Sequence, residues 1–356
     1  MKLDGIVKSV HQLNKIRYRP KLLAGIARGY FRTLVLRKPT LRICEFSITA
    51  ACQSKCEFCY ASKFAKKGQQ LLSVDEIRNT WRQAKRMGAF STVLLGGEPL
   101  LRRDFMDIID ALEPKDNIVT FTSNAILLTR DMLVDLKRRG VFLVNFSLNS
   151  LEAEANDAMR GYDGHRDKVF EVIETCKSLG LDVFLGVATS KKNLQDTISI
   201  VDFAREKGLG VTINLMTPMG RAECMGDELF DAEFWATLRD LYNRNPGLRS
   251  DYDVNLDLKI GCPAGFEKIH VAPYGDVTGC SMNPASFGNV RDMPLEQIVA
   301  KMRSFHHFAK RAPNCIVAVD KEYIGDYSEF AATQAASPYD IELNPNYQKD
   351  KVLRAG

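Results

Sequence analysis

The fold of this 356-residue chain is decided by one stretch, CEFSITAACQSKCEFC, which runs from Cys44 to Cys59. Its first residues are rich in β-branched and aromatic side chains and predict a strand. Cys52, Cys56 and Cys59 then follow one another closely, so a single loop brings three thiols together. A closed zinc site needs four protein ligands, and none of the five histidines lies nearby. Three thiolates suit a four-iron cluster with one iron open, and zinc is the alternative.

This stretch begins a series in which strand and helix patterns alternate. Short apolar runs predict six strands, and longer stretches with helical spacing follow them. Such alternation predicts an α/β fold with a parallel sheet covered by helices, built as a partial (β/α)6 barrel. Ligand sites of such folds lie at the carboxyl ends of the strands. The predicted strands are 44–49, 91–96, 118–122, 141–148, 182–189 and 210–216, and the predicted helices include 73–87, 129–139, 166–179 and 195–207.

The CxxxCxxC spacing after a first barrel strand resembles the radical S-adenosylmethionine (radical SAM) superfamily. Phe58 supports the resemblance, because the family places an aromatic residue there, against the adenine of SAM. The family's second signature follows the second predicted strand as Gly96-Gly97-Glu98-Pro99. The resemblance implies that this segment holds the amino group of SAM, with Glu98 accepting from the ammonium. A plain strand-to-helix turn is the alternative.

Further matches to the family occur after the third and fourth predicted strands. The resemblance implies that Asn124 contacts the ribose region of SAM, and that Ser147 and Arg160 contact its ribose or carboxylate. Asn149 stands where the family more often has Asp. Ser147 and Asn149 are equally well explained as strand-end groups that satisfy the local backbone.

The resemblance implies two cofactors, a [4Fe–4S] cluster on Cys52, Cys56 and Cys59, and SAM chelated to the open iron. A one-electron donor such as flavodoxin or ferredoxin would reduce the cluster, and SAM would be cleaved to a 5′-deoxyadenosyl radical. This radical removes hydrogen from an unactivated carbon while the barrel positions the substrate, an oxidoreductase chemistry. Dehydrogenation, bond formation and epimerisation are all open as outcomes.

A second cysteine pattern consists of Cys262, twelve residues, a glycine, four residues and Cys280. It resembles the start of the SPASM or twitch extension of some radical SAM proteins. The resemblance implies an auxiliary [4Fe–4S] cluster with Cys262, Cys280 and Cys315 as ligands. The alternatives are a zinc site, or a hairpin in which Cys315 is a free thiol. Cys44 and Cys176 are expected to be small hydrophobes. Cys224, near the expected mouth of the barrel, is expected to be a loop thiol, with action on the substrate as the alternative.

These patterns divide the chain into four parts. A basic amphipathic arm precedes the barrel, and a small α+β iron–sulfur module and a tail follow it. The expected bounds are 1–42 for the arm, 43–245 for the barrel, 246–318 for the module and 319–356 for the tail.

Charge is divided unevenly between the arm and the rest of the chain. Residues 1–42 hold eleven Lys or Arg and one acidic residue, whereas the remainder holds 38 basic and 43 acidic groups. A helical wheel of the arm has a basic face and an apolar face, which is typical of a helix on a membrane surface. The alternative is a helix packed on the barrel with its basic face solvated. The basic face holds Lys21, Arg28 and Arg32, and the apolar face holds Leu22, Leu23, Ile26, Ala27, Tyr30 and Leu34.

No apolar run of ~18 residues predicts a transmembrane helix, and no secretory signal is visible. We therefore expect a cytoplasmic protein, with peripheral contact at the inner membrane surface as an open alternative and no nucleic-acid partner. The arm is too short for a peptide-recognition domain, which favours a small-molecule or membrane-associated, lipid-like substrate. The other hypotheses are a radical SAM maturase of a ribosomally made peptide or protein, and a non-catalytic iron–sulfur or zinc protein.

Overall fold

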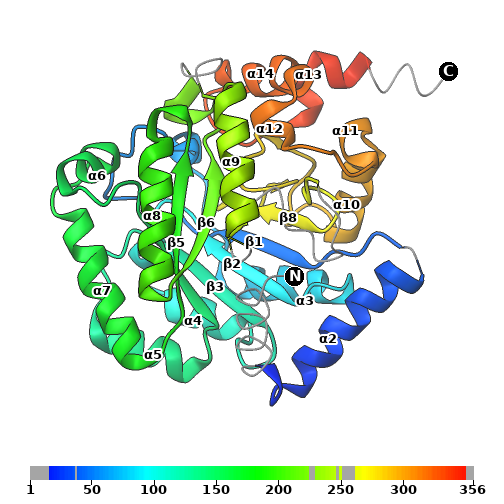
Figure 1. The fold of residues 1–356 in the computed structure, drawn as a ribbon. Helices are drawn as coiled ribbons and strands as arrows, with labels where there is room; N and C mark the ends of the chain where they lie inside the picture. Colours follow the sequence, from blue (N-terminus) through cyan, green and yellow to red (C-terminus); the bar gives the residue numbers. More distant parts are fainter. Residues whose placement is uncertain (1–15, 37, 224–228, 246–247, 251–260, 350–356) are drawn as a thin grey trace.

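One curved sheet of nine strands forms the centre of the described chain (Figure 1). The computed structural model describes residues 16–36, 38–223, 229–245, 248–250 and 261–349. The strand order is β7-β6-β5-β4-β3-β2-β1-β8-β9, and β1 to β6 pair in parallel, each with the next. The predicted partial (β/α)6 barrel is confirmed. The strands are β1 (Ile43–Ser47), β2 (Ser91–Leu95), β3 (Ile118–Ser123), β4 (Leu143–Ser147), β5 (Val183–Thr189), β6 (Gly210–Leu215), β7 (Arg249–Ser250), β8 (Lys268–Val271) and β9 (Val277–Thr278), with β10 (Ala285–Ser286) and β11 (Tyr339–Asp340) in a separate pair.

Helices follow the strands and surround the sheet (Figure 1). The first barrel helix begins at a capping box, in which the Ser73 hydroxyl accepts from Glu76 N–H and the Glu76 carboxylate accepts from Ser73 N–H. The α-helices are α2 (Pro20–Tyr30), α3 (Val74–Arg86), α4 (Phe105–Ala111), α5 (Arg130–Arg139), α6 (Ala153–Arg160), α7 (His165–Leu179), α8 (Leu194–Lys207), α9 (Ala232–Arg244), α10 (Leu295–Ser304), α11 (His306–Ala309), α12 (Ile316–Val319), α13 (Lys321–Tyr323) and α14 (Glu329–Ala332). Short helical turns are η1 (Phe31–Val35), η2 (Tyr60–Lys63), η3 (Pro99–Leu101), η4 (Lys191–Asn193), η6 (Ile324–Ser328) and η7 (Ile341–Leu343).

The main core lies between the outer face of the sheet and the helices. Alternate residues of the strands are fully buried in it, such as Val119 and Phe121 of β3 and Phe146 of β4. Because side chains alternate along a strand, the intervening residues face the inside of the barrel. Thr120 and Asn145 are polar examples, whereas Leu143 and Phe184 form a small apolar cluster on the same face.

Two strands of the predicted C-terminal module belong to the barrel sheet. β8 pairs in parallel with β1, with Lys268 opposite Ile43 and His270 opposite Glu45. β9 pairs antiparallel with β8 and ends two residues before Cys280. The sequence does not reveal this pairing, because β8 is a four-residue run without a following helix. The module is therefore joined to the strand that leads into the first cysteine loop.

The C-terminal residues 321–349, which the sequence analysis assigned to a tail, are folded. Tyr323 exchanges hydrogen bonds with the side chain of Asn283, and the Tyr339 hydroxyl donates to the Tyr327 carbonyl. These three tyrosines and Tyr347 are buried. Aromatic burial of this kind stabilises a segment without helical periodicity, which is why the sequence pattern missed it.

The N-terminal arm packs on the barrel through α2. Leu22 is fully buried, and Gly29 lies against the ring of Phe90. Leu23, predicted on the same apolar face, is instead 38% exposed. Within the described residues, no helix combines the length and apolar character needed to cross a bilayer. Residues 1–15 and the Leu34 side chain lie outside the described part.

Candidate functional site

The three cysteines predicted as cluster ligands lie in the loop between β1 and η2. Burial raises the pKa of Cys52 to about 11, and the neighbouring Cys56 raises it too. Burial also raises the pKa of Cys59, again with a contribution from Cys56. Cys52 and Cys59 are therefore thiols at neutral pH until a metal centre stabilises their thiolates.

The donor set of the loop separates a cluster from a single zinc ion. A closed zinc site needs four protein ligands, whereas the loop offers the three thiols of Cys52, Cys56 and Cys59. A four-iron cluster held by three thiolates keeps one iron open. The donor set therefore fits a cluster better than zinc.

The Gly96–Pro99 segment lies directly against the chain that enters the cysteine loop. The Gly97 N–H donates to the Thr49 carbonyl at 2.8 Å. A Cβ on Gly97 would lie 2.2 Å from the carbonyl oxygen of Ala51, and one on Gly96 would lie 2.5 Å from that of Thr49. Only glycine allows so close an approach of two backbones. The segment is thus more than a strand-to-helix turn, because it fixes the start of the cysteine loop.

Glu98 is buried beside this loop and is held by three donors. Its carboxylate accepts from the Ser123 hydroxyl at 2.9 Å and from the N–H groups of Asn124 and Leu100 at 2.8 and 3.2 Å. Burial raises the pKa of Glu98 to about 7, against the effect of these hydrogen bonds and of Arg160. Such a carboxyl group is suited to receive an ammonium, which would stabilise its charged form.

Asn124 connects Glu98 to the cysteine loop. Its Nδ2 lies 3.9 Å from Cys52 Sγ, and its Oδ1 accepts from Gln53 Nε2 at 3.2 Å. Its backbone N–H is one of the donors to Glu98. The structure thereby brings the predicted residues Asn124, Glu98 and Cys52 into one group.

Arg160 contacts the cysteine loop from the end of α6. Its Nη1 lies 3.4 Å from Cys56 Sγ, and its guanidinium lies 5.4 Å from the centre of the Phe58 ring. The Arg160 carbonyl accepts from Lys55 N–H at 3.2 Å. Arg160, which is predicted to contact SAM, therefore also contacts the cysteine loop.

The end of β4 carries Ser147, which is half-buried at the edge where β3 also ends. Asn149 is fully buried, and its side-chain Nδ2 donates to the Ala188 carbonyl at 2.9 Å. Asn149 thus satisfies the local backbone, in agreement with the structural alternative for this residue. Ser147 stays a prediction for SAM binding.

The segment after β6, where Cys224 was expected as a loop thiol, contacts the cysteine loop through two residues without a predicted role. Arg221 donates from its N–H to the Cys59 carbonyl at 3.1 Å and from Nη1 to the Cys56 carbonyl at 2.9 Å. Gly220 has φ 61°, and a Cβ there would lie 2.3 Å from the Cys59 oxygen. The pair Gly220-Arg221 begins four residues after the end of the last predicted barrel strand, and no local motif marks it in the sequence. Cys224 lies outside the described part.

The other three predicted ligands, Cys262, Cys280 and Cys315, line one small pocket. All three are buried. Cys280 follows β9 and Cys315 precedes α12, so strand pairing and a helix start bring them together. Three thiols that line one pocket suit an iron–sulfur cluster, and this set includes Cys315. The remaining lining of the pocket is Leu215, Ala264, Lys268 and Met282.

A chain of buried hydrogen bonds joins β1 to this pocket. The Thr278 hydroxyl donates to the Cys280 carbonyl at 2.7 Å, so its oxygen accepts from His270 Nδ1 at 3.1 Å. His270 Nε2 then accepts from the Ser47 hydroxyl at 2.8 Å. Burial lowers the pKa of His270 to about 3, which keeps the ring neutral. The hydrogen-bond partners of His270 therefore fix its tautomer, with the proton on Nδ1.

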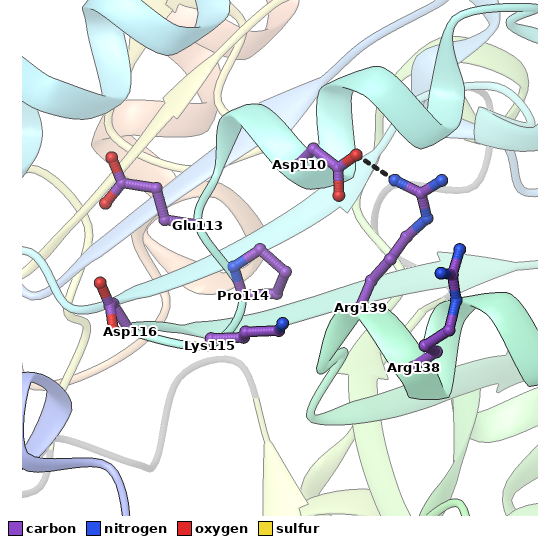
Figure 2. A pocket seen from close by; sticks show the side chains of 7 residues that line it. All are labelled: Asp110, Glu113, Pro114, Lys115, Asp116, Arg138 and Arg139. Atoms are coloured by element: carbon purple, nitrogen blue, oxygen red, sulfur yellow. Dashed lines mark hydrogen bonds and ion pairs between the residues drawn. The ribbon is translucent and has the colours of Figure 1, made fainter.

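A surface hollow at the other end of the barrel is unrelated to the cysteines. It lies where β3 and β4 begin, and Figure 2 shows its charged lining, with Arg139 paired to Asp110. Asp116, another lining residue, is paired with Lys21 of α2 at 2.8 Å. Since ligand sites of this fold lie at the carboxyl ends of strands, we assign this hollow no part in the chemistry.

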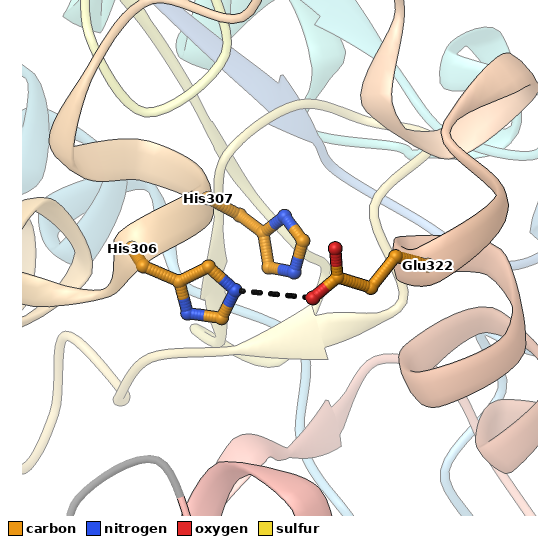
Figure 3. A group of neighbouring side chains, drawn as sticks. All are labelled: His306, His307 and Glu322. Carbon is orange, nitrogen blue, oxygen red and sulfur yellow. Dashed lines mark ion pairs between the residues drawn. The ribbon is translucent and has the colours of Figure 1, made fainter. Parts of the chain in front are cut away.

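A group of His306, His307 and Glu322 lies near the surface of the C-terminal part (Figure 3). His306 Nε2 is 3.8 Å from the Glu322 carboxylate, and the two imidazole rings have centres 3.9 Å apart. Two imidazoles on one zinc ion, with Zn–N bonds of ~2.0 Å, have ring centres roughly 5 Å apart. The rings would have to separate before one ion could hold both, so we treat the group as a surface ion pair.

Two family models match the chain in the regions just described. Residues 46–204 match the radical SAM superfamily, and residues 262–317 match the SPASM iron–sulfur cluster-binding domain. The first range contains Cys52, Cys56 and Cys59, and the second contains the cysteines of the pocket. The chain therefore contains a radical SAM region and, after it, a SPASM iron–sulfur cluster-binding region. Its cofactors are SAM, a [4Fe–4S] cluster and auxiliary iron–sulfur.

The chain is similar to several proteins that carry different names. The AdoMet-dependent heme synthase of Methanosarcina barkeri is 23% identical over 285 residues, which cover 72% of this chain and 81% of the relative. The mycofactocin maturase MftC of Mycolicibacterium smegmatis is 27% identical over 211 residues, 59% of this chain and 51% of the relative. Streptococcus suis SuiB bound to its precursor peptide SuiA has a TM-score of 0.61 at 18% identity, and the match covers 78% of this chain and 71% of SuiB. At this low identity, the similarity to SuiB shows a shared fold.

Proposed function

We propose that this radical SAM enzyme abstracts hydrogen from a small-molecule or membrane-associated substrate at the carboxyl ends of the barrel strands. The observation that carries the proposal is that Cys52, Asn124 and Glu98 form one group there. When bound and reduced, the cluster that Cys52, Cys56 and Cys59 would hold would supply the electron for the reductive cleavage of SAM, which is the source of the hydrogen-abstracting radical. A flavodoxin or a ferredoxin is the class of donor that suits this one-electron step.

The residues of the barrel site have separate parts in this proposal. Cys52, Cys56 and Cys59 would hold three irons of the cluster. Glu98 would accept from the ammonium of SAM, and its three donors keep the carboxylate in place. Arg160 offsets negative charge at the cysteine loop, from which its Nη1 is 3.4 Å away.

The pocket of the SPASM extension supplies the second centre. Cys262, Cys280 and Cys315 would hold three irons of an auxiliary [4Fe–4S] cluster. This pocket is closed by Leu215, the last residue of β6, so it borders the barrel. An auxiliary cluster held there would therefore lie next to the end of β6.

The exposed side of the arm supports a membrane-associated substrate. Phe31, Val35 and Leu36 are 53%, 63% and 47% exposed, and they follow α2 directly. Arg28 and Arg32 lie in the same short segment. Single exposed apolar residues need no explanation, but a group of them among basic residues fits an anionic lipid surface. Each basic residue near such a surface contributes ~1 kcal/mol.

Vesicle flotation tests this contact. The full chain should float with vesicles that contain phosphatidylglycerol and not with vesicles of phosphatidylcholine alone. The triple variant Phe31→Ser, Val35→Ser, Leu36→Ser should stay unbound. A matched variant at three exposed apolar positions elsewhere, Leu127→Ser, Val134→Ser, Leu343→Ser, should float like the parent. Equal behaviour of the two variants would refute the assignment of the arm.

Deuterium transfer tests the substrate class. The reconstituted enzyme is incubated with SAM and with deuterated lipid extract, small-metabolite extract or peptide pools in separate reactions. Deuterium in 5′-deoxyadenosine from the lipid or metabolite pool supports the proposal. Transfer from the peptide pool alone would assign the chain as a peptide maturase, the second candidate, which the likeness to peptide-bound SuiB favours. The Cys52→Ala variant should give no 5′-deoxyadenosine in any reaction.

A further inference from the structure

A buried charge stands in the auxiliary pocket. Lys268 lies at the start of β8, is 4% exposed, and is the one charged residue that lines the pocket in the described part of the chain. The other residues of that lining are the three cysteines and apolar side chains. An ammonium in such surroundings has little water to stabilise it, so its neighbours must compensate for its charge.

Glu45 of β1 is the anionic neighbour of Lys268. The Lys268 Nζ lies 3.3 Å from a carboxylate oxygen of Glu45, and both side chains are buried. The pair exists because β8 is added to the sheet beside β1. A buried ion pair costs several kcal/mol of desolvation per ion and is often no more stable than apolar residues of the same size. Packing alone therefore gives little reason for charges at this place.

A cluster in the pocket would give the charges of Lys268 and Glu45 an electrostatic role. Three thiolates make such a cluster anionic, and its reduction adds one more negative charge. The nearby ammonium stabilises the reduced state more than the oxidised state, and the carboxylate of Glu45 acts in the opposite sense. Net charge and burial around a cluster are what set its reduction potential.

We propose that the Lys268–Glu45 pair sets the reduction potential of the auxiliary cluster, with Lys268 raising it and Glu45 limiting the rise. This inference rests on the proposed ligand set of Cys262, Cys280 and Cys315. In this role Lys268 and Glu45 act on the cluster through their charges, and neither residue is a ligand.

The test uses the full chain with the triple substitution Cys52→Ala, Cys56→Ala, Cys59→Ala, so that only the auxiliary cluster contributes a signal. After anaerobic reconstitution, the midpoint potential is measured by electron paramagnetic resonance during redox titration. Lys268→Met in this background should shift the potential to more negative values, and Glu45→Gln should shift it to more positive values. Lys268→Arg, which keeps the charge, should restore a value near that of the parent.

The opposite signs distinguish an electrostatic role from a structural one. A matched control is Lys66→Met, which breaks the partly buried pair between Lys66 and Asp276 outside the pocket and should leave the potential unchanged. Shifts of the same sign in Lys268→Met and Glu45→Gln, or no shift in either, would overturn the inference. If Lys268→Met fails to hold a cluster, the shift of Glu45→Gln decides alone. If the parent itself binds no iron, the ligand set is wrong and the inference fails with it.

Discussion

The chemistry of the barrel site depends on a few buried groups whose protonation differs from that in water. Glu98 is the clearest case, because its pKa is raised to about 7 by burial. A neutral carboxylic acid and a charged carboxylate are then both accessible near neutral pH. An incoming ammonium selects the carboxylate, so ligand binding and proton release are linked at this residue.

Glu98→Gln should weaken the binding of SAM about 10- to 100-fold, since a charge-assisted hydrogen bond of ~1.5–3 kcal/mol is lost. For the parent, the affinity for SAM should fall as the pH is lowered below about 7, because Glu98 becomes protonated. Equilibrium binding of SAM to the reconstituted protein between pH 6 and 8 measures both effects. Glu57→Gln, an exposed residue of the same loop, is the control and should bind like the parent.

The pairing of two backbone segments holds the cysteine loop in place. Gly97→Ala should disturb this pairing, because the new Cβ would meet the Ala51 carbonyl at 2.2 Å. Overpacking of this kind costs ~1–3 kcal/mol of folding free energy, and here the displaced chain is the one that enters the cluster loop. We expect a lower melting temperature and a lower iron content after reconstitution.

The control for this substitution is Gly325→Ala. A Cβ at Gly325 has no heavy atom within 4 Å, and its backbone has no positive φ. Its melting temperature and iron content should match those of the parent. An unchanged iron content in Gly97→Ala would show that the cysteine loop does not depend on the Gly96–Pro99 segment.

Local motifs allowed the cysteine loop and the Gly96–Pro99 segment to be located from the sequence. Arg221 and the Lys268–Glu45 pair could not be located in this way. Each depends on contacts between segments far apart in the chain, such as the addition of β8 beside β1. The folded C-terminal residues were missed for a related reason, since buried tyrosines stabilise them without a repeating pattern.

Two buried histidines influence the stability of the whole molecule. Burial lowers the pKa of His165 and of His270 to about 3, whereas a histidine in the unfolded chain titrates near 6.5. Below about pH 6.5 the unfolded chain therefore binds protons that the folded chain does not. As the pH is lowered from about 6.5 to 3, the free energy of unfolding should fall by ~1.4 kcal/mol per pH unit for each histidine. Above about pH 6.5 the histidines are neutral in both states, and the free energy of unfolding no longer depends on them.

Urea unfolding at several values between pH 5 and 7 checks this expectation. His165→Gln removes one titrating ring and can still accept from the Asn156 side chain, which donates to His165 Nδ1 at 3.0 Å. Its free energy of unfolding should depend less steeply on pH than that of the parent, by ~1.4 kcal/mol per unit. Identical slopes would mean that His165 is protonated in the folded protein.

The addition of β8 and β9 to the barrel sheet has a consequence for dividing the protein into parts. A chain cut near residue 245 would leave β1, the strand that leads into the cysteine loop, as an open edge with unpaired N–H and C=O groups. Such edges pair with other copies and promote aggregation. Exchanging this extension for that of a relative would likewise replace the neighbour of β1. The two cluster regions therefore have to be kept together when the protein is shortened or recombined with a relative.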